Sequence, residues 1–228
     1  MSLKNLSDVY CIIPVFNEEK VILETIKEIQ AAGFRNLIVV DDGSTDGTYE
    51  KIKNLKGIVA LKLLINRGKG AAIKTGIDAG KLLKAETVIT LDGDGQHNPK
   101  DIYKMLEAIE KGNDVVLGTR LKNAKGMPFY KIIANHIGNF FTWLIYGLWV
   151  SDSQSGFRAY SKKALALIDT KTDRYEYDSE VIREIYRNKL KFCEIPIEVR
   201  YTEYSMSKQN KQGLKNGIKT LIKMVISS

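Results

Sequence analysis

Hydrophobic and polar residues alternate along residues 1–120 in blocks that predict strands and helices in regular succession. Short apolar, β-branched runs predict strands over residues 9–14, 36–40, 58–65, 87–91 and 114–119. Between them, apolar residues spaced three or four apart predict helices over residues 18–32, 45–54, 68–83 and 99–111. Strands that alternate with helices across short connections indicate an α/β fold, with a mostly parallel sheet flanked by helices on both faces.

The regular alternation ends after residue 120. We expect a loop over residues 123–128, an aromatic helix over 129–148, a short strand over 156–160, a helix over 177–187 and a strand over 192–199. Pro196 suggests that this last strand lies at an edge of the sheet. Residues 201–212 are polar, and residues 213–226 predict a basic amphipathic helix. Because neither a repeat nor a linker interrupts the chain, residues 1–228 are predicted to form a single domain.

Length and composition fit a folded cytosolic protein. The chain has 228 residues, of which 44% are hydrophobic, enough for a substantial core. Cys11 and Cys193 lie far apart in apolar runs, so we expect core thiols in a reducing cytosol. The N-terminus lacks the pattern of a secretory signal, and no run of about 18 apolar residues predicts a membrane span.

Two carboxylates follow the fourth predicted strand. Asp92 and Asp94 come directly after the apolar run 87–91 and are separated by one glycine. In an open α/β sheet the ligand crevice lies at the carboxyl ends of the strands. Paired carboxylate oxygens there suit a hard divalent cation that also binds phosphate. Taken alone, the same residues also fit an ordinary Asp-Gly turn.

The first two predicted strands also end in polar side chains. These are Asn17 and Glu18 after the first strand, and Asp41 and Asp42 after the second. Such groups accept hydrogen bonds from a base or a ribose hydroxyl, or hold a cation. A turn explains part of the second segment, with Ser44 or Thr45 expected as the N-cap of the next helix.

A glycine-rich loop, Asn66-Arg67-Gly68-Lys69-Gly70, follows the third predicted strand and begins a helix. Backbone N–H groups at a helix start, with Arg67 and Lys69 nearby, favour a bound phosphate. The loop matches neither the P-loop nor the dinucleotide-binding fingerprint. A plain glycine-rich loop with a solvated lysine therefore stays an alternative.

Positive charge is concentrated at the C-terminal end. The net charge is +8, and residues 189–228 contribute +5 from eight basic and three acidic side chains. This asymmetry indicates a local anionic partner. No nucleic acid is expected as that partner, because the basic excess is terminal and acidic residues crowd the expected crevice.

Six segments together resemble glycosyltransferase family 2, in the branch of dolichyl-phosphate mannose synthases and other polyprenyl-phosphate glycosyltransferases. They are PVFNE (14–18), VDDGSTDGT (40–48), NRGKG (66–70), LDGDGQH (91–97), GTR (118–120) and SDSQSGFRAY (151–160). The resemblance implies the nucleotide-diphospho-sugar transferase (A-type) fold with an aromatic and basic C-terminal part. Residues 1–120 would be the nucleotide-sugar-binding half, and residues 121–228 the acceptor- and membrane-facing half.

The resemblance also implies an activity. It is the inverting transfer of a hexose from a GDP- or UDP-sugar to a polyprenyl phosphate, such as dolichyl or undecaprenyl phosphate, with Mg²⁺ or Mn²⁺ as cofactor. Two alternatives stay open. In one, the acceptor is a saccharide hydroxyl; in the other, the chain is a non-catalytic module that binds nucleotide-sugars or anionic lipids.

By position, the resemblance gives a role to each matching side chain. Residues expected to bind the nucleotide-sugar are Pro14, Asn17, Glu18, Asp41, Asp42, Lys69 and Asp92. Residues expected to hold the metal are Asp92, Asp94 and Gln96. Residues expected to contact the acceptor phosphate are Arg120, Lys131, Gln154, Arg158 and Lys208. The family often has a second arginine after the following loop, and the nearest candidate here is Lys131. This departure weakens the expectation of a two-pronged contact with phosphate, because an ammonium is a point charge.

Catalysis is expected from Asp92, Asp94, Asp152 and Arg120. A divalent metal and nearby cations stabilise the negative charge that builds on a departing diphosphate. An acceptor phosphate is already ionised near neutrality, whereas a sugar hydroxyl needs a carboxylate base. Asp152 is either that base or the residue that orients Arg120 or Arg158. No role is assigned to His97 or His136, which have no partner histidine at ligand spacing.

Two features of the second half favour an anionic membrane surface as a partner. Trp143, Tyr146 and Trp149 recur at roughly helical spacing, as interfacial side chains do, although an aromatic face packed in the core has the same pattern. The final segment spaces lysines four residues apart beside apolar positions, which fits an anionic leaflet or an ordinary solvated face. These are Lys211, Lys215, Lys219 and Lys223. We therefore expect a cytoplasmic protein, peripheral on the inner face of the cell membrane or its endoplasmic-reticulum equivalent.

Overall fold

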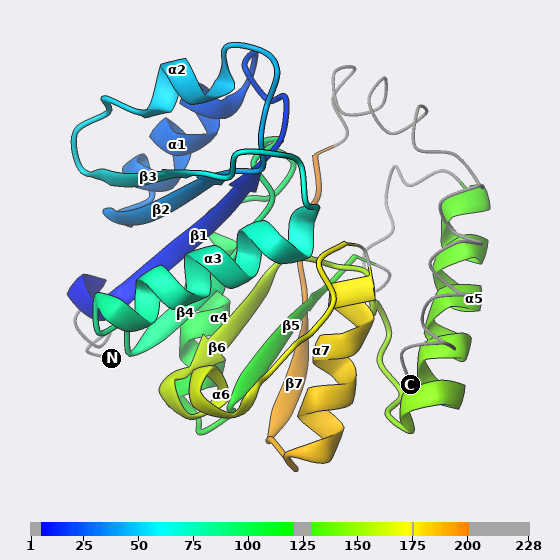
Figure 1. The fold of residues 1–228 in the computed structure, drawn as a ribbon. Helices are drawn as coiled ribbons and strands as arrows, with labels where there is room; N and C mark the ends of the chain where they lie inside the picture. The colour runs from blue at the N-terminus through cyan, green and yellow to red at the C-terminus, as the bar shows by residue number, and fades with distance from the viewer. Residues whose placement is uncertain (1–5, 121–128, 175, 201–228) are drawn as a thin grey trace.

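The computed structural model describes residues 6–120, 129–174 and 176–200, except for the side chains of residues 129–131 and 134. It has a sheet with strand order β3-β2-β1-β4-β6-β5-β7 and helices on both faces (Figure 1). The strands are β1 (Val9–Val15), β2 (Asn36–Asp41), β3 (Ile58–Lys62), β4 (Thr87–Thr90), β5 (Val115–Thr119), β6 (Arg158–Ser161) and β7 (Phe192–Pro196). The helices are a short 3-10 turn (Leu6–Asp8), α1 (Ile22–Ala31), α2 (Thr48–Ile52), α3 (Lys69–Leu82), α4 (Asp101–Glu110), α5 (Phe129–Tyr146), α6 (Lys162–Leu167) and α7 (Glu176–Arg187). The predicted α/β fold is confirmed.

The strand register brings the expected functional segments to one edge of the sheet. Val15 at the end of β1 pairs with Asp41 at the end of β2. β6 is inserted antiparallel between β4 and β5, and its first residue, Arg158, pairs with both Thr90 and Leu117. The ends of β4 and β5 therefore flank the start of β6, about 10 Å apart at ordinary strand spacing.

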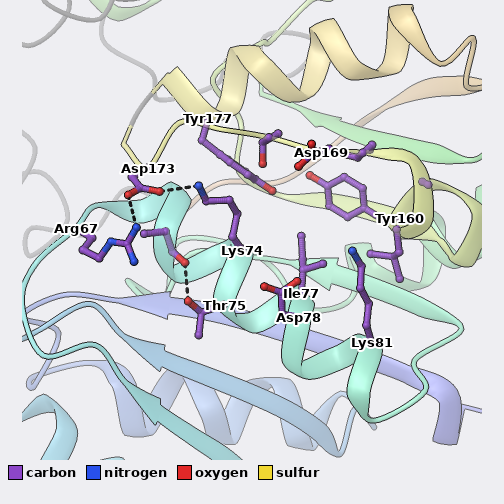
Figure 2. Close-up of a pocket in the computed structure, with 15 residues that line it drawn as sticks. Arg67, Lys74, Thr75, Ile77, Asp78, Lys81, Tyr160, Asp169, Asp173 and Tyr177 are labelled. Atoms are coloured by element: carbon purple, nitrogen blue, oxygen red, sulfur yellow. Dashed lines mark hydrogen bonds and ion pairs between the residues drawn. The ribbon is translucent and has the colours of Figure 1, made fainter. Parts of the chain in front are cut away.

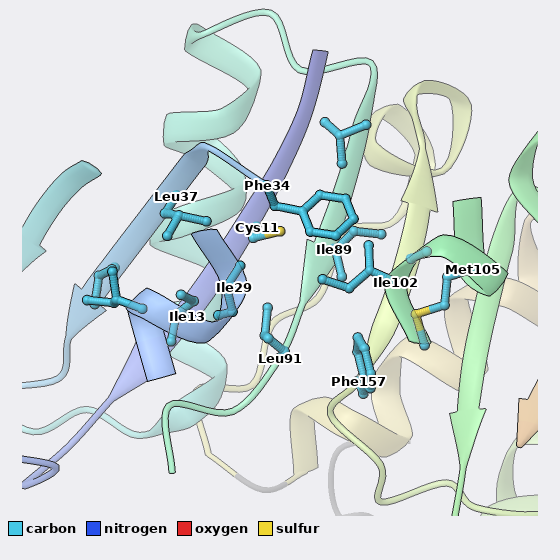
Figure 3. Packing of buried hydrophobic residues seen from close by; sticks show 14 of the residues in the cluster. Cys11, Ile13, Ile29, Phe34, Leu37, Ile89, Leu91, Ile102, Met105 and Phe157 are labelled. Atoms are coloured by element: carbon cyan, nitrogen blue, oxygen red, sulfur yellow. The ribbon is translucent and has the colours of Figure 1, made fainter. Parts of the chain in front are cut away.

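The two faces of the sheet bury separate apolar clusters, because successive strand residues point to opposite faces. On one face Cys11 and Ile13 of β1 pack with residues of α1 and α4, including Ile29 and Ile102 (Figure 3). On the other face Ile12 packs in a cluster with residues of α3, α6 and α7. This three-layer arrangement keeps the sheet rigid beneath its loops.

Several predicted boundaries shift because loop residues bond to other loops. The helix predicted to begin at residue 18 begins at Ile22, and the one predicted from residue 45 begins at Thr48. The N-cap prediction is wrong: Gly47 precedes α2, while Ser44 donates its hydroxyl to Asp41. Helix α6 was not predicted, since its six residues are too few for a periodic pattern.

The edge position predicted for the last strand is confirmed. β7, which contains Pro196, lies at an edge of the sheet. Both cysteines are free thiols, and burial raises the pKa of Cys11 to about 12. In the three described stretches of chain, no helix is long and apolar enough to cross a bilayer. The polar segment 201–212 and the helix predicted over 213–226 lie outside the described residues.

Helix α5 has an inverted distribution of polar and apolar residues. It stands beside α7 at one side of the sheet (Figure 1). Its buried side chains include Asn135, Asn139, Thr142 and Tyr146, while its exposed side chains include Ile133, Ile137, Phe140, Trp143 and Leu144. The core alternative for the aromatic residues is therefore wrong for Trp143 and Trp149, which are exposed, and right for Tyr146.

Candidate active site

The loops after β1 and β2 are joined to each other at the edge of the sheet. Asn17 adopts a positive φ of 55°, and its Oδ1 accepts a hydrogen bond of 2.9 Å from the backbone N–H of Thr45. The N–H of Glu18 donates to Thr48 Oγ1 at 2.8 Å. Asn17 and the buried Glu18 thus lie against the loop that follows Asp41 and Asp42.

The two aspartates after β2 are both buried but do different things. Asp42 accepts from the N–H groups of Arg67 (2.9 Å) and Gly68 (2.8 Å), which fixes the glycine-rich loop at the start of α3. Burial raises the pKa of Asp42 more than these two bonds lower it. Asp41 accepts from Ser44 through Oδ1, while its Oδ2 is buried and has no hydrogen-bond partner among the described residues.

Lys69, from the first turn of α3, lies between the two halves of the chain. Its ammonium is 2.7 Å from Asp92 Oδ1 and 3.9 Å from Asp178 Oδ2 of α7. Burial lowers the pKa of Lys69, but the charges of Asp92 and Asp178 outweigh it and raise the pKa overall. A side chain at Gly156 would strike Lys69 Nζ, so this glycine permits the close approach. Sequence reasoning missed Asp178, which no local pattern connects to Lys69.

His97 has a contact that sequence reasoning missed. Its Nε2 lies 3.2 Å from Asp92 Oδ2, and its buried ring packs on Phe157 at a centroid distance of 4.8 Å. Burial raises the pKa of Asp92, but Lys69 and His97 outweigh burial and hold that pKa below its usual range. Asp92 is therefore a carboxylate held from two sides.

Asp94 and Gln96 complete the predicted metal-binding segment. Asp94 Oδ1 accepts from the N–H of Gln96 at 3.1 Å, and Gln96 is buried. Burial, followed by repulsion from Asp92, raises the pKa of Asp94. Asp92 and Asp94 carry carboxylate oxygens and Gln96 carries an amide oxygen, which are the donor types that Mg²⁺ and Mn²⁺ prefer, but Lys69 and His97 engage both oxygens of Asp92 in this structure. Across the described part of the chain, no cluster of three or more His, Cys, Asp or Glu side chains is arranged to hold a metal.

Arg120 and Asp152, both predicted to act near the acceptor, form a two-pronged ion pair. Arg120 donates from Nε to Asp152 Oδ2 and from Nη2 to Oδ1, each at 2.7 Å, and its backbone N–H adds a third bond of 3.0 Å. Asp152 is fully buried, whereas a quarter of the Arg120 side chain is exposed. Of the two predicted roles for Asp152, this geometry favours the orientation of Arg120 over that of a base.

The other residues predicted to contact the acceptor phosphate are placed differently. Arg158 is 1% exposed and donates to the carbonyls of Ser153, Ser155 and Asp178, so its guanidinium holds the loop. Its contact with the acceptor phosphate stays a prediction. Gln154 is exposed next to Gly138 of α5. The Lys131 side chain and Lys208 lie outside the described residues.

A loop from the second half of the chain closes over the start of α3. Asp173 pairs with Arg67 at 2.7 Å and with Lys74 at 2.6 Å (Figure 2). Glu180 holds the same loop by accepting from the N–H groups of Lys171 and Thr172. The guanidinium of Arg67 is thus paired with Asp173. A cavity of about 370 Å³ beside this ion pair is lined by Arg67 but not by Asp92, Asp94 or Lys69.

Proteins of similar sequence identify the family to which this chain is related. The family model for "Glycosyl transferase family 2" matches residues 10–168. An uncharacterised protein of Methanocaldococcus jannaschii is 43% identical, over 97% of this chain and 93% of its own length. The UDP-N-acetylglucosamine–dolichyl-phosphate N-acetylglucosaminyltransferase of Methanococcus voltae is 39% identical, over 88% of each chain.

A solved structure confirms the fold. Glucosyl-3-phosphoglycerate synthase from Mycobacterium tuberculosis, in complex with Mn²⁺, UDP and phosphoglyceric acid, superposes with a TM-score of 0.69 at 18% identity. The match covers 95% of this chain and 78% of that one. The predicted A-type fold and the resemblance drawn from the six sequence segments are both confirmed.

Proposed function

The chain belongs to glycosyltransferase family 2, and from that membership we propose that it transfers a hexose from a GDP- or UDP-sugar to a polyprenyl phosphate. The relative from Methanococcus voltae, whose name specifies a dolichyl-phosphate acceptor, supports this choice. The structural observation that best supports a lipid-phosphate acceptor is the position of α5. This helix exposes apolar side chains and bonds, through Asn139, to the loop that holds Asp152 and Arg120.

The donor binds at the ends of β1, β2 and β4 in this proposal. Asn17, Glu18 and the free oxygen of Asp41 contact the nucleoside, while Lys69 balances negative charge close to Asp92. Asp92, Asp94 and Gln96 would hold Mg²⁺ or Mn²⁺, which when bound supplies positive charge beside the donor diphosphate. The all-oxygen donor set and the raised pKa of Asp94 support this assignment.

The acceptor phosphate meets Arg120 on the other side of β6. A phosphate oxygen attacks the anomeric carbon and forms the new C–O bond as the bond from sugar to diphosphate breaks. The electron pair of the broken bond leaves with the nucleoside diphosphate, and the anomeric configuration inverts. Since the acceptor is already ionised, it needs no base. This agrees with an Asp152 whose two oxygens are both engaged by Arg120.

The outer face of α5 is proposed to rest on the membrane that carries the acceptor. Phe140, Trp143 and Trp149 form an exposed aromatic group, with ring centroids 5.9 Å and 6.3 Å apart for the successive pairs. Tryptophan side chains favour the interface between lipid and water. A protein seated in this way is peripheral on the membrane face that meets the cytoplasm.

Radiolabelled transfer tests the proposal directly. The protein is incubated with undecaprenyl or dolichyl phosphate, Mn²⁺ and a labelled UDP-N-acetylglucosamine, UDP-glucose or GDP-mannose. We expect label to pass into the organic phase with at least one donor. Label that stays in water on an added saccharide supports a hydroxyl acceptor instead. Donor binding without any turnover supports the non-catalytic alternative.

A further inference from the structure

One asparagine of α5 forms hydrogen bonds on both sides of Asp152, in a loop that Arg158 and Glu194 also hold. Asn139 is 1% exposed, and its Nδ2 donates to the carbonyl of Ser151 at 2.5 Å. Its Oδ1 accepts from both the backbone N–H and the hydroxyl of Ser153, each at 2.9 Å. One side chain thus bonds both neighbours of Asp152.

The contacts continue from this asparagine to the acceptor side of the site. Asp152 holds Arg120 through three hydrogen bonds of 2.7 to 3.0 Å. On the far side of the loop, Glu194 of β7 accepts from the N–H (2.6 Å) and the hydroxyl (2.8 Å) of Ser151. The loop is therefore fixed between α5 and the edge strand, and its carboxylate aims the guanidinium.

The inner face of α5 is fitted closely to the same loop. A Cβ at Gly138 would lie 2.7 Å from Gln154 Nε2, so only glycine fits there without a shift of Gln154. A guanidinium binds phosphate through paired N–H groups in one rigid plane. A small rotation of its carboxylate partner therefore turns that plane and misplaces both N–H groups. The position of α5 thus determines the direction of this fork of N–H groups.

We propose that Asn139 is a positioning residue for the acceptor: through it α5 sets the orientation of Asp152, and Asp152 sets that of Arg120. This inference rests on the proposed role of Arg120 in binding the acceptor phosphate. Asn139 touches neither substrate, so its effect falls on the acceptor alone.

Steady-state kinetics with a short-chain isoprenyl phosphate, which needs no membrane, tests the proposal. We expect Asn139→Ala to raise the acceptor KM roughly tenfold, while the donor KM changes by less than about twofold. Thermal shift with the nucleotide-sugar confirms that the variant is folded and binds its donor. Asn113→Ala is the matched control, since Asn113 also bonds a backbone carbonyl (2.8 Å) but lies at the opposite end of β5. We expect that control to keep the wild-type acceptor KM.

A double-mutant cycle separates positioning from a general loss of packing. Arg120→Lys keeps the charge but removes the fork. If Asn139 acts through Arg120, adding Asn139→Ala to Arg120→Lys raises the acceptor KM by less than about twofold more. Additive effects, an unchanged acceptor KM in Asn139→Ala, or equal changes in both substrates' KM values would each overturn the inference. A wild type that transfers no sugar to any lipid phosphate would instead contradict the proposed function.

Discussion

The proposed donor and acceptor parts of the site differ in their charge balance. In the proposed donor part Asp92 and Asp94 repel each other, and Lys69 and His97 contact Asp92. In the proposed acceptor part the buried Asp152 is fully paired with Arg120, which remains partly exposed. The carboxylates of the proposed donor part thus favour a bound cation. In the proposed acceptor part, by contrast, the guanidinium of Arg120 is presented to an anion.

The carboxylates of the proposed donor part predict the largest effect. Asp92→Asn and Asp94→Asn each remove a carboxylate from the proposed metal site, and we expect kcat to fall roughly 10²- to 10³-fold. Calorimetry should show a matching loss of Mn²⁺ affinity, while circular dichroism stays as in the wild type. Activity within about fivefold of the wild type in both variants would contradict the metal assignment.

The outer face of α5 predicts the next effect. We expect Trp143→Ala combined with Leu144→Ala to weaken binding to vesicles of phosphatidylcholine and phosphatidylglycerol roughly 30-fold, because two large apolar side chains contribute about 2 kcal/mol or more on transfer. Co-sedimentation measures the binding. Leu64→Ala is the control, since Leu64 is 96% exposed but follows β3 at the opposite edge of the sheet. Equal losses in both variants would sink the assignment of α5 to the membrane.

A smaller effect is expected for the proposed acceptor part. Arg120→Lys keeps the positive charge but loses the fork that Asp152 orients, so the acceptor KM should rise about tenfold with little change in the donor KM. Arg187→Lys on the exposed side of α7 serves as a control for the loss of a guanidinium. A change confined to the donor KM would show that Arg120 belongs to the donor part.

The smallest effect concerns Glu180, which holds the loop that pairs with the start of α3 through Asp173. Burial raises the pKa of Glu180, but hydrogen bonds from Thr172 and Lys171 outweigh burial and hold this pKa below its usual range. Its contribution to stability is therefore present above the ordinary pKa of 4.5 and is lost as pH falls through the folded-state value. We expect Glu180→Gln to lower the free energy of unfolding by about 1–2 kcal/mol at pH 7.

Urea denaturation at several pH values checks this last prediction. The difference between the wild type and Glu180→Gln should shrink as pH falls below about 4.5. A difference that stays constant down to pH 3 would mean that Glu180 acts through packing and not through its charge.

The sequence by itself placed the residues of the proposed donor part at the ends of strands. Asn17, Asp41 and Asp92 each follow an apolar run, and parallel strands bring such ends together whatever the rest of the chain does. The Asp92-Gly93-Asp94 segment therefore pointed to cation chemistry before any contact was known. Local periodicity also predicted the strands from β1 to β5, although the boundaries moved by a few residues.

Only the tertiary structure decided which side chains face the proposed acceptor part of the site. The pattern that predicted α5 is the same whether its apolar face is buried or exposed, and it is the bonds of Asn139 to the distant Ser151 and Ser153 that turn the polar face inward. Likewise, Arg158 looks like a surface arginine in the sequence but is buried beside Asp178 of α7. The ends of strands follow from the local pattern of apolar residues. The direction in which a side chain faces depends on partners elsewhere in the chain, and the periodicity of the sequence does not record those partners.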